Sequence, residues 1–368
     1  MEYKSKIVDI LQNKTTLTGL TREELEQFAL SIGEPAYRGR QLYRWIYHRR
    51  AKDFAEMTDL PAPLRERLSA TAQVGSLEVA IAPRRSRDLS QKFLFELADG
   101  LRVETVYLPE SPGETVCISS QVGCALGCQF CATGRMGFFR NLSASEIILQ
   151  VLECERRVET KLTNVVFMGM GEPFHNYDNV TKAVRLLADP DGICITASRI
   201  TVSTVGIVPM IERWIQETPP AKLAISLHGT TDERRNRIMP VNKAYPLEIL
   251  MKSVRRLAHV TKYPVTFEYI MIAGLNDRRE DAANLKLLLR NVPAKVNLIR
   301  LHPTGSELVP SSDTAIDQFM GWLVEEGLQC TLRESRGVED KAACGMLYTE
   351  EPFHPTKARA WERTSKPD

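Results

Sequence analysis

The chain has 368 residues, of which 43% are hydrophobic and 26% are charged, a composition typical of a globular protein with one large or two unequal domains. It contains no apolar run long enough to span a membrane, and its charged N-terminus lacks the apolar core of a signal peptide, so we expect a cytoplasmic protein with no membrane partner. The net charge of +2 neither requires nor excludes nucleic acid as a partner. Cytoplasmic cysteines stay reduced, so a cluster among the eight cysteines would indicate a metal or redox site.

Residues 1–90 are predicted to form a small helical domain. The stretch TREELEQFALSIG has Thr21 as its N-cap and Glu24 at the capping-box position, and it ends at Gly33. Two more helices are expected, one after Pro35 and one at LPAPLRERL.

The stretch YRGRQLYRWIYHRR combines five arginines with three tyrosines and a tryptophan. Arginine and aromatic side chains together suit contact with RNA phosphates and stacking on bases. The alternative is an amphipathic helix that buries Leu42, Trp45 and Ile46 and leaves the arginines in solvent, and both interpretations can hold at once. The helical domain is therefore a candidate accessory domain for RNA binding.

Residues 91–115 are predicted to form a connecting β-hairpin, with Asp99 and Gly100 at its turn. Beyond it, short β-branched runs alternate with helical stretches, a pattern that predicts right-handed crossovers and a parallel sheet. Six or so such units are too few for an eight-stranded barrel, so we expect an α/β open or partial barrel over residues 116–350 and a basic tail over 351–368. The expected strands are 116–120, 164–168, 199–203, 222–227, 265–271, 296–300 and 330–334.

Chemically useful residues follow several of these strands. GMGEP follows the second strand, STVG ends the third, SLH ends the fourth, and Asn297 lies in the sixth. In barrels of this class the ligands bind at the carboxyl ends of the strands. We therefore expect these residues to meet on one rim of the barrel.

Three cysteines, Cys124, Cys128 and Cys131, have the spacing C-x3-C-x2-C, and Cys117 lies seven residues ahead of them. Three thiolates could hold three irons of a cubane 4Fe–4S cluster and leave the fourth iron open to a substrate. A structural zinc ion with Cys117 or a histidine as its fourth ligand is the alternative. The remaining cysteines outside the C-terminal segment are interpreted as packing residues: Cys154, Cys194 and Cys330.

The cysteine motif, with Phe130 before its last cysteine, resembles the signature of radical S-adenosylmethionine (SAM) enzymes. The wider chain resembles one family among them, the RNA adenine-C2 methyltransferases of the RlmN type, with close likeness to relatives of the Cfr type. The resemblance implies a partial (β/α)6 barrel with a small N-terminal helical domain for RNA. It covers nearly the whole chain, through GEPAYRGRQLYRWIY, RVETVYLP, SSQVGCALGCQFCATG, RNLSASEI, GMGEP, ITVSTVGIVP, AISLH, VNLI and AACG.

The resemblance also implies the cofactors and the residues that bind them. The three motif cysteines would hold one 4Fe–4S cluster, whose open iron binds SAM. Taken alone, Ser203, Asn297 and His228 could equally be structural hydrogen-bonding residues. The positions that match contacts to SAM are Gly171, Glu172, Ser203, Ser226, Leu227, His228 and Asn297.

Carbon 2 of adenine is not a nucleophile, so ordinary methylation by SAM does not reach it. The resemblance implies that one SAM methylates Cys344, and that a radical derived from a second SAM takes hydrogen from this S-methyl group. The resulting methylene radical adds to adenine. Cys117 would then attack the sulfur of Cys344 and form a disulfide as the product leaves. Glu104 matches the residue that removes the ring proton.

The resemblance implies two RNA substrates, an adenine of 23S rRNA at the peptidyl transferase centre and the adenine next to the anticodon of tRNAs. It also implies an electron donor such as flavodoxin, and we expect the enzyme to be a monomer.

Near the methyl carrier the chain departs from the RlmN pattern at Gly337-Val338-Glu339-Asp340 and at Met346, and Arg300-Leu301-His302-Pro303 is closer to the Cfr type. Methylation of carbon 8 of the same adenine is therefore one alternative. A non-catalytic RNA-binding protein with a structural zinc is the other.

Overall fold

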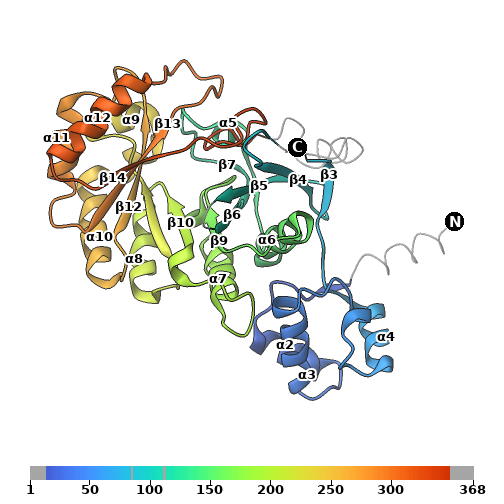
Figure 1. The fold of residues 1–368 in the computed structure, drawn as a ribbon. Helices are drawn as coiled ribbons and strands as arrows, with labels where there is room; N and C mark the ends of the chain where they lie inside the picture. Colours follow the sequence, from blue (N-terminus) through green and yellow to red (C-terminus); the bar gives the residue numbers. More distant parts are fainter. Residues whose placement is uncertain (1–13, 84–85, 111–112, 349–368) are drawn as a thin grey trace, which may run out of the picture.

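The computed structural model describes residues 14–83, 86–110 and 113–348. A small helical region lies beside a ten-stranded sheet whose outer face is covered by helices (Figure 1). Two short strands, β7 and β8, form a separate hairpin next to α5. Of the helices within these described ranges, none is both long and apolar enough to cross a membrane.

The helical region begins at a short parallel pair of strands and contains the three helices expected from the sequence. Thr21 caps the first helix, and its side chain and that of Glu24 form the predicted reciprocal capping box. Gly33 follows this helix with a positive φ of 77°. The elements are β1 (Thr15–Thr16), α2 (Arg22–Ser31), α3 (Tyr37–Tyr43), the π-helix η1 (Arg44–His48), the 3-10 helix η2 (Phe54–Glu56), α4 (Ala62–Thr71) and β2 (Ala72–Gln73).

The large sheet has the order β14-β13-β12-β11-β10-β9-β6-β5-β4-β3, and its strands from β6 and β9 to β14 are parallel. All seven expected parallel strands are present, although the first ends at Cys117 and begins earlier than predicted. Their bounds are β6 (Gly113–Cys117), β9 (Asn164–Phe167), β10 (Ile200–Thr204), β11 (Lys222–Ser226), β12 (Val265–Met271), β13 (Ala294–Arg300) and β14 (Cys330–Arg333). The expected α/β partial barrel is therefore confirmed.

The predicted hairpin is also present, as β4 (Gln91–Glu96) and β5 (Arg102–Glu110), and Gly100 has the positive φ of 85° that its turn requires. It is more than a connector, because β5 also pairs with β6 and so extends the barrel sheet. A further strand, β3 (Glu78–Ile81), pairs with β4. The range 1–90, predicted as helical, therefore includes one strand of the sheet.

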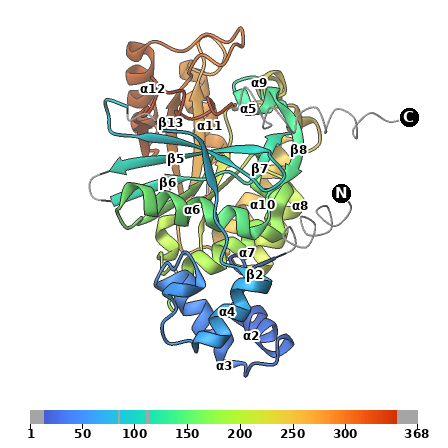
Figure 2. The same cartoon turned by 90° about the vertical axis from the view of Figure 1, so that its right-hand side faces the viewer.

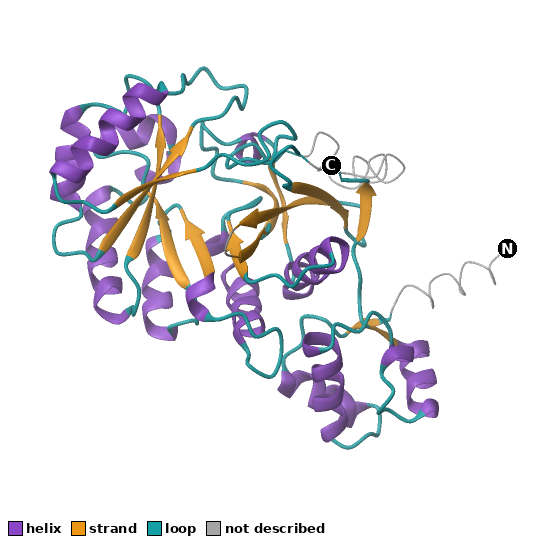
Figure 3. Cartoon of the chain, in the orientation of Figure 1, coloured by secondary structure: helices purple, strands orange, loops and turns teal. Residues whose placement is uncertain are grey.

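Helices cover the outer face of the parallel strands, and Figures 2 and 3 show this layer beside the sheet. Most helices bury one apolar face in a single large hydrophobic cluster, together with outward-facing residues of the strands. The helices are α5 (Ala132–Arg135), α6 (Ala144–Val158), α7 (Tyr177–Ala188), α8 (Val208–Glu217), α9 (Asp232–Ile238), α10 (Leu247–Val260), α11 (Arg279–Leu288) and α12 (Asp313–Glu325). The hairpin of β7 (Gln121–Cys124) and β8 (Gly137–Asn141) encloses the cysteine motif.

The inner face of the barrel is polar along much of its length. On β12, Phe267 and Tyr269 lie in the hydrophobic cluster, whereas the alternate residues Thr266 and Glu268 line cavities inside the barrel. This alternation follows from the two-residue period of a strand. The interior of this barrel therefore contains cavities lined in part by polar side chains. The interior of a closed eight-stranded barrel, in contrast, is packed with branched apolar side chains.

Candidate active site

The cysteine motif lies on the loop between β7 and α5. Cys124 is the last residue of β7 and Cys131 is the N-cap of α5, and together with Cys128 they line one cavity. The loop is held to the barrel by the Gln129 amide, which donates to the carbonyl of Ile238 (3.0 Å). Burial raises the pKa of Cys124 to about 12 and, with the neighbouring thiols, raises that of Cys128 as well. A metal would displace these protons on binding.

Within the described ranges, no three His, Cys, Asp or Glu side chains are close enough together to hold one metal ion. A zinc ion needs its ligands within about 2.3 Å of a common centre, whereas the thiolates of a cubane bind different irons and stand further apart. Three thiols that line one cavity are a soft donor set of the kind that a 4Fe–4S cluster takes, and three ligands leave one of its irons open.

Glu172 lies in the same cavity and is fixed by the strands around it. Its carboxylate accepts from the amides of Phe174 and Val205 (both 3.0 Å), and its own amide donates to the side chain of Gln121 (2.8 Å). Burial raises the pKa of Glu172 to about 7. Gly171 has a φ of 97°, and a Cβ there would lie 2.5 Å from the Cβ of Gln121, so only glycine fits this approach.

Two serines and a histidine complete this wall of the cavity. The hydroxyls of Ser203 and Ser226 are 3.5 Å apart, and His228 follows β11 in the left-handed region with a φ of 54°. The ring of His228 accepts the Ile270 amide at Nδ1 (3.1 Å) and meets Phe130 edge-on at 4.6 Å. Burial lowers the pKa of His228 to about 3, so the imidazole is neutral and carries its proton on Nε2.

The other two residues expected to contact SAM lie outside the cavity lining. The Leu227 side chain is fully buried in the hydrophobic cluster, and its carbonyl accepts from Nε of Arg235 (2.9 Å). Asn297 is in the middle of β13 and not at its carboxyl end, and it donates to Glu268 (3.2 Å) and accepts from Thr331 (2.7 Å). Asn297 was expected on the rim of the barrel because the sequence does not show how far along β13 each residue lies relative to the neighbouring strands.

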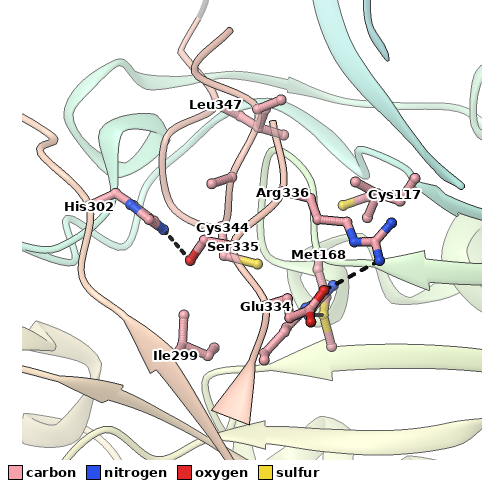
Figure 4. Close-up of a pocket in the computed structure, with 13 residues that line it drawn as sticks. Cys117, Met168, Ile299, His302, Glu334, Ser335, Arg336, Cys344 and Leu347 are labelled. Atoms are coloured by element: carbon pink, nitrogen blue, oxygen red, sulfur yellow. Dashed lines mark hydrogen bonds and ion pairs between the residues drawn. The ribbon is translucent and has the colours of Figure 1, made fainter. Parts of the chain in front are cut away.

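A second cavity adjoins the first and contains both cysteines of the expected transfer chemistry (Figure 4). Cys117, at the end of β6, and Cys344, on the C-terminal segment, both line it. Burial, with a smaller contribution from Cys344, raises the pKa of Cys117 to about 12. The guanidinium of Arg333 and the amide of Met168 oppose this increase. All eight cysteines of the chain are free thiols in this structure.

Cys344 lines both cavities and so connects them. Its segment is fixed by backbone contacts: the Ala132 amide donates to the carbonyl of Gly345 (2.8 Å), and the hydroxyl of Thr133 donates to that of Leu347 (2.6 Å). Both partners are in the helix that directly follows the cysteine motif. The C-terminal segment and the motif are thus held together as one unit.

Glu104 lies beside this unit but lines neither cavity. It is buried on β5, where one carboxylate oxygen pairs with Nζ of Lys92 (2.8 Å) and the other accepts the Tyr348 amide (2.8 Å). Burial raises the pKa of Glu104, although Lys92 opposes the increase. The expected proton acceptor is therefore next to the C-terminal segment that carries Cys344.

Residues to which the sequence analysis gave no role in the site also line it. Glu268 and Arg333 line the first cavity, and His302 lines the second with its Nε2 2.8 Å from the hydroxyl of Ser335. The sequence feature that could have identified Glu268 as a site residue is its carboxylate within the otherwise largely apolar strand VTFEYIM. That signal becomes usable only when the inward-facing side of the strand is known.

Comparisons with known proteins agree with this architecture. Residues 15–74 match the ribosomal RNA large subunit methyltransferase N-terminal domain, and residues 118–285 match the radical SAM superfamily. The chain is 47% identical to a probable dual-specificity RNA methyltransferase RlmN of Moorella thermoacetica over 92% of its own length and 98% of the relative. It is 45% identical to the dual-specificity RNA methyltransferase RlmN of Geobacter sulfurreducens over 90% of its length and 91% of the relative.

A solved structure is similar as well. The crystal structure of a radical SAM methyltransferase from Sphaerobacter thermophilus is 42% identical and superposes with a TM-score of 0.86, covering 90% of this chain and 99% of that one. The similarity in sequence and structure thus extends over both the helical region and the barrel. The chain belongs to the RlmN family of radical SAM RNA methyltransferases.

Proposed function

We propose that the protein methylates carbon 2 of an adenine in 23S rRNA and of the adenine next to the anticodon in tRNAs, with two SAM consumed per methyl group. The supporting observation is the position of Cys344, which lines both the cavity of the motif cysteines and the cavity of Cys117. A methyl carrier has to meet the SAM site on one side and the resolving thiol on the other. The names of the relatives support RNA as the substrate class.

In this proposal a 4Fe–4S cluster is held by Cys124, Cys128 and Cys131. SAM is bound by the wall of the first cavity, which consists of Gly171, Glu172, Ser203, Ser226 and His228. Leu227 contributes its backbone to SAM binding, and Asn297 acts through Glu268. When bound, the cluster and SAM would supply the radical chemistry for hydrogen abstraction. The carboxylate of Glu172 can accept from the ammonium or ribose of SAM, and the neutral His228 can donate from Nε2.

Cys344 and Cys117 would carry the methyl group and release the product. The thiolate of Cys344 accepts a methyl group, and after transfer its sulfur remains bonded to the base through the methylene carbon. The adduct would first lose its unpaired electron to the oxidised cluster and its ring proton to a base. The Cys117 thiolate would then attack that sulfur, so that an S–S bond forms, the C–S bond breaks with its electron pair moving to the product carbon, and this carbon takes up a proton to complete the methyl group. Because burial raises the pKa of Cys117 to about 12, this attack depends on a cation that stabilises the thiolate, and Arg333 is placed to do so.

Glu104 would act as the general base for the ring proton. Burial raises the pKa of Glu104, which makes its carboxylate a stronger proton acceptor than an exposed one. Its pairing with Lys92 and the Tyr348 amide requires the C-terminal segment to move when a base enters. Methylation of carbon 8 is the alternative, and the Cfr-like residue His302 in the Cys117 cavity is the observation that favours it.

Mass spectrometry of RNA separates these two outcomes. RNA from cells that lack the gene should carry no methyl group at the target adenine, and reintroduction of the gene should restore 2-methyladenosine in 23S rRNA and tRNA. Finding 8-methyladenosine instead would support the alternative. Reintroduction of Cys344→Ala should restore no methylation at all, and methylated RNA made by this variant would contradict the carrier role.

Cys117→Ala tests product release. This variant should still attach RNA but fail to free it, so protein crosslinked to RNA should accumulate and be detected as a slower, ribonuclease-sensitive band in denaturing gels. Cys154→Ala, which removes a buried thiol that lines neither cavity, is the matched control and should give no such band. Loss of iron from the Cys117 variant would mean that Cys117 is a cluster ligand instead.

Metal analysis tests the cluster itself. Anaerobically purified protein should contain about four irons and four sulfides per chain, as a cubane requires. One tightly bound zinc and no iron would instead support the non-catalytic RNA-binding alternative. Substitution of Cys128 by alanine should remove the iron while leaving the far-ultraviolet circular dichroism of the fold in place.

A further inference from the structure

A third cavity lies at the opposite end of the barrel from the motif cysteines. It is lined by residues of every parallel strand, many of them from the first positions of those strands, such as Lys222 on β11 and Lys295 on β13. Met168, Glu268 and Arg333 line both this lower cavity and the cavity of the motif cysteines. The two cavities are therefore separated by these three side chains, and the proposed chemistry places no substrate or cofactor in the lower one.

The lower cavity has an excess of positive charge. Four cationic side chains line it, Arg199, Lys222, Lys295 and Arg333, against the single carboxyl group of Glu268. Within the described part of the chain, neither Lys222 nor Lys295 has an ion pair or a side-chain hydrogen bond, although both are half-buried. Burial and the charge of Lys295 together lower the pKa of Lys222. Two ammonium groups that repel each other in a partly desolvated site are stabilised by an anion between them.

Two threonine hydroxyls, which are neutral hydrogen-bond donors, line the lower cavity beside these lysines. The strand register places Thr201 beside Lys222 and Thr266 beside Lys295. Neither hydroxyl has a side-chain hydrogen bond among the described residues, so both are available to a ligand. Two ammonium groups with flanking hydroxyls match a compact ion with several oxygens and more than one negative charge, which is the chemistry of a phosphate group.

We infer that the lower cavity of the barrel binds a small phosphate-bearing anion through Lys222, Lys295, Thr201 and Thr266. The ligand is small because its four contacts come from neighbouring positions of the adjacent strands β10, β11, β12 and β13. Arg199, which is exposed at the mouth, supplies a further positive charge to attract it. The bound anion lies beneath the SAM site and is separate from the methyl transfer to RNA.

Calorimetry with inorganic pyrophosphate tests this site. The anaerobic, cluster-containing enzyme in buffer free of phosphate and sulfate should bind one pyrophosphate per chain with a saturable heat. The double variant Lys222→Gln, Lys295→Gln should weaken binding by at least about tenfold, as expected for lost hydrogen bonds to a charged group. Lys243→Gln, Lys252→Gln, which removes two exposed lysines of the same barrel, should bind like wild type. No saturable heat in the wild type, or equal affinity in both double variants, overturns the inference.

A second measurement uses only the wild-type protein, in case the double variant does not fold. A lysine with a lowered pKa is acylated readily near neutral pH, so acetylation of Lys222 can be quantified by mass spectrometry with Lys252 as the internal reference. Pyrophosphate should protect Lys222 and Lys295 and leave Lys252 unaffected. If pyrophosphate gives no protection, or if only a short RNA protects these lysines, the cavity is not a small-anion site. Neither measurement depends on methyltransferase activity.

Discussion

At the scale of single residues, Glu268 combines a buried carboxyl group with an incomplete set of hydrogen bonds. Asn297 donates to one of its oxygens (3.2 Å), and the other oxygen is buried with no hydrogen-bond partner among the described residues. Burial raises the pKa of Glu268, although Arg333 opposes the increase. A carboxylate with an unpartnered oxygen destabilises the folded state, and protonation removes that penalty.

Substitution Glu268→Gln should therefore change how stability depends on pH. Because the folded-state pKa of Glu268 is above its usual 4.5, its contribution to stability is complete below pH 4.5 and is lost as the pH rises through the folded-state value. Glutamine does not titrate, so the thermal midpoint of the variant should rise relative to wild type between pH 4.5 and pH 8. Glu66→Gln, at an exposed position of α4, should show no such trend. A difference between Glu268→Gln and wild type that is constant with pH would contradict this account.

At the scale of secondary-structure elements, the helical region depends on the close crossing of α2 and α3. A Cβ on Gly39 of α3 would lie closer than 3.0 Å to the backbone of Glu26 on α2, where no flexible side chain can move aside. Leu25 and Leu42 are buried at the same crossing. A glycine is thus required here to bring two helices into contact, and not to form a turn.

Gly39→Ala should destabilise the protein by about 1–3 kcal/mol, as overpacking of a tight contact does. Gly321→Ala is the matched control, because Gly321 lies within α12 and a Cβ there meets nothing within 4 Å. That substitution should stabilise by roughly 0.5–1 kcal/mol through helix propensity alone. Urea unfolding followed by circular dichroism measures both values, and a neutral Gly39→Ala would show that the crossing can adjust.

The elements also show what the sequence could and could not predict. The capping box at Thr21 and the strand at 265–271 were predicted correctly because their signals are local. The hairpin of β7 and β8 was not expected, because its strands are short and a register shift interrupts them between Val122 and Gly123. The cysteine motif could be found from its spacing, but the inward direction of Glu268 and Arg333 depends on a barrel that no local pattern describes.

At the scale of the whole molecule, the helical region is attached to the barrel by polar contacts at α6 and after α7. Arg50 pairs with Glu155 (2.7 Å), and the guanidinium of Arg156 donates to the carbonyls of Arg50 (3.3 Å) and Ala51 (3.1 Å). The hydroxyl of Tyr43 donates to the carboxylate of Asp189 (2.7 Å). These contacts fix the helical region at the end of the molecule seen below α6 and α7 in Figure 2.

If the helical region presents RNA to the barrel, Arg156→Met should weaken this presentation by loosening the attachment. The KM for RNA should rise by about tenfold, the scale of one lost hydrogen bond from a charged group, while SAM affinity stays unchanged. Arg185→Met is the control, since the half-exposed Arg185 of α7 pairs with Glu217 of α8 in the helical layer of the barrel and forms no hydrogen bond or ion pair with the described residues of the helical region. Steady-state methylation assays give both constants, and an equal increase in KM for the two variants would exclude a role for the attachment.

The C-terminal segment is fixed to parts of the chain that are very distant in sequence. The Gly337 amide donates to Asp88 (2.7 Å) across 249 residues, and the Tyr348 amide reaches Glu104 across 244. Contacts of such separation form late in folding, because local elements and shorter loops close first. In a molecule whose barrel has folded but whose C-terminal segment has not docked, the motif loop would still be held by the Gln129 amide, but Cys344 would not lie beside it. The order of folding therefore makes Cys344 the last part of the candidate site to arrive, and under the proposed function such an immature molecule would transfer no methyl group.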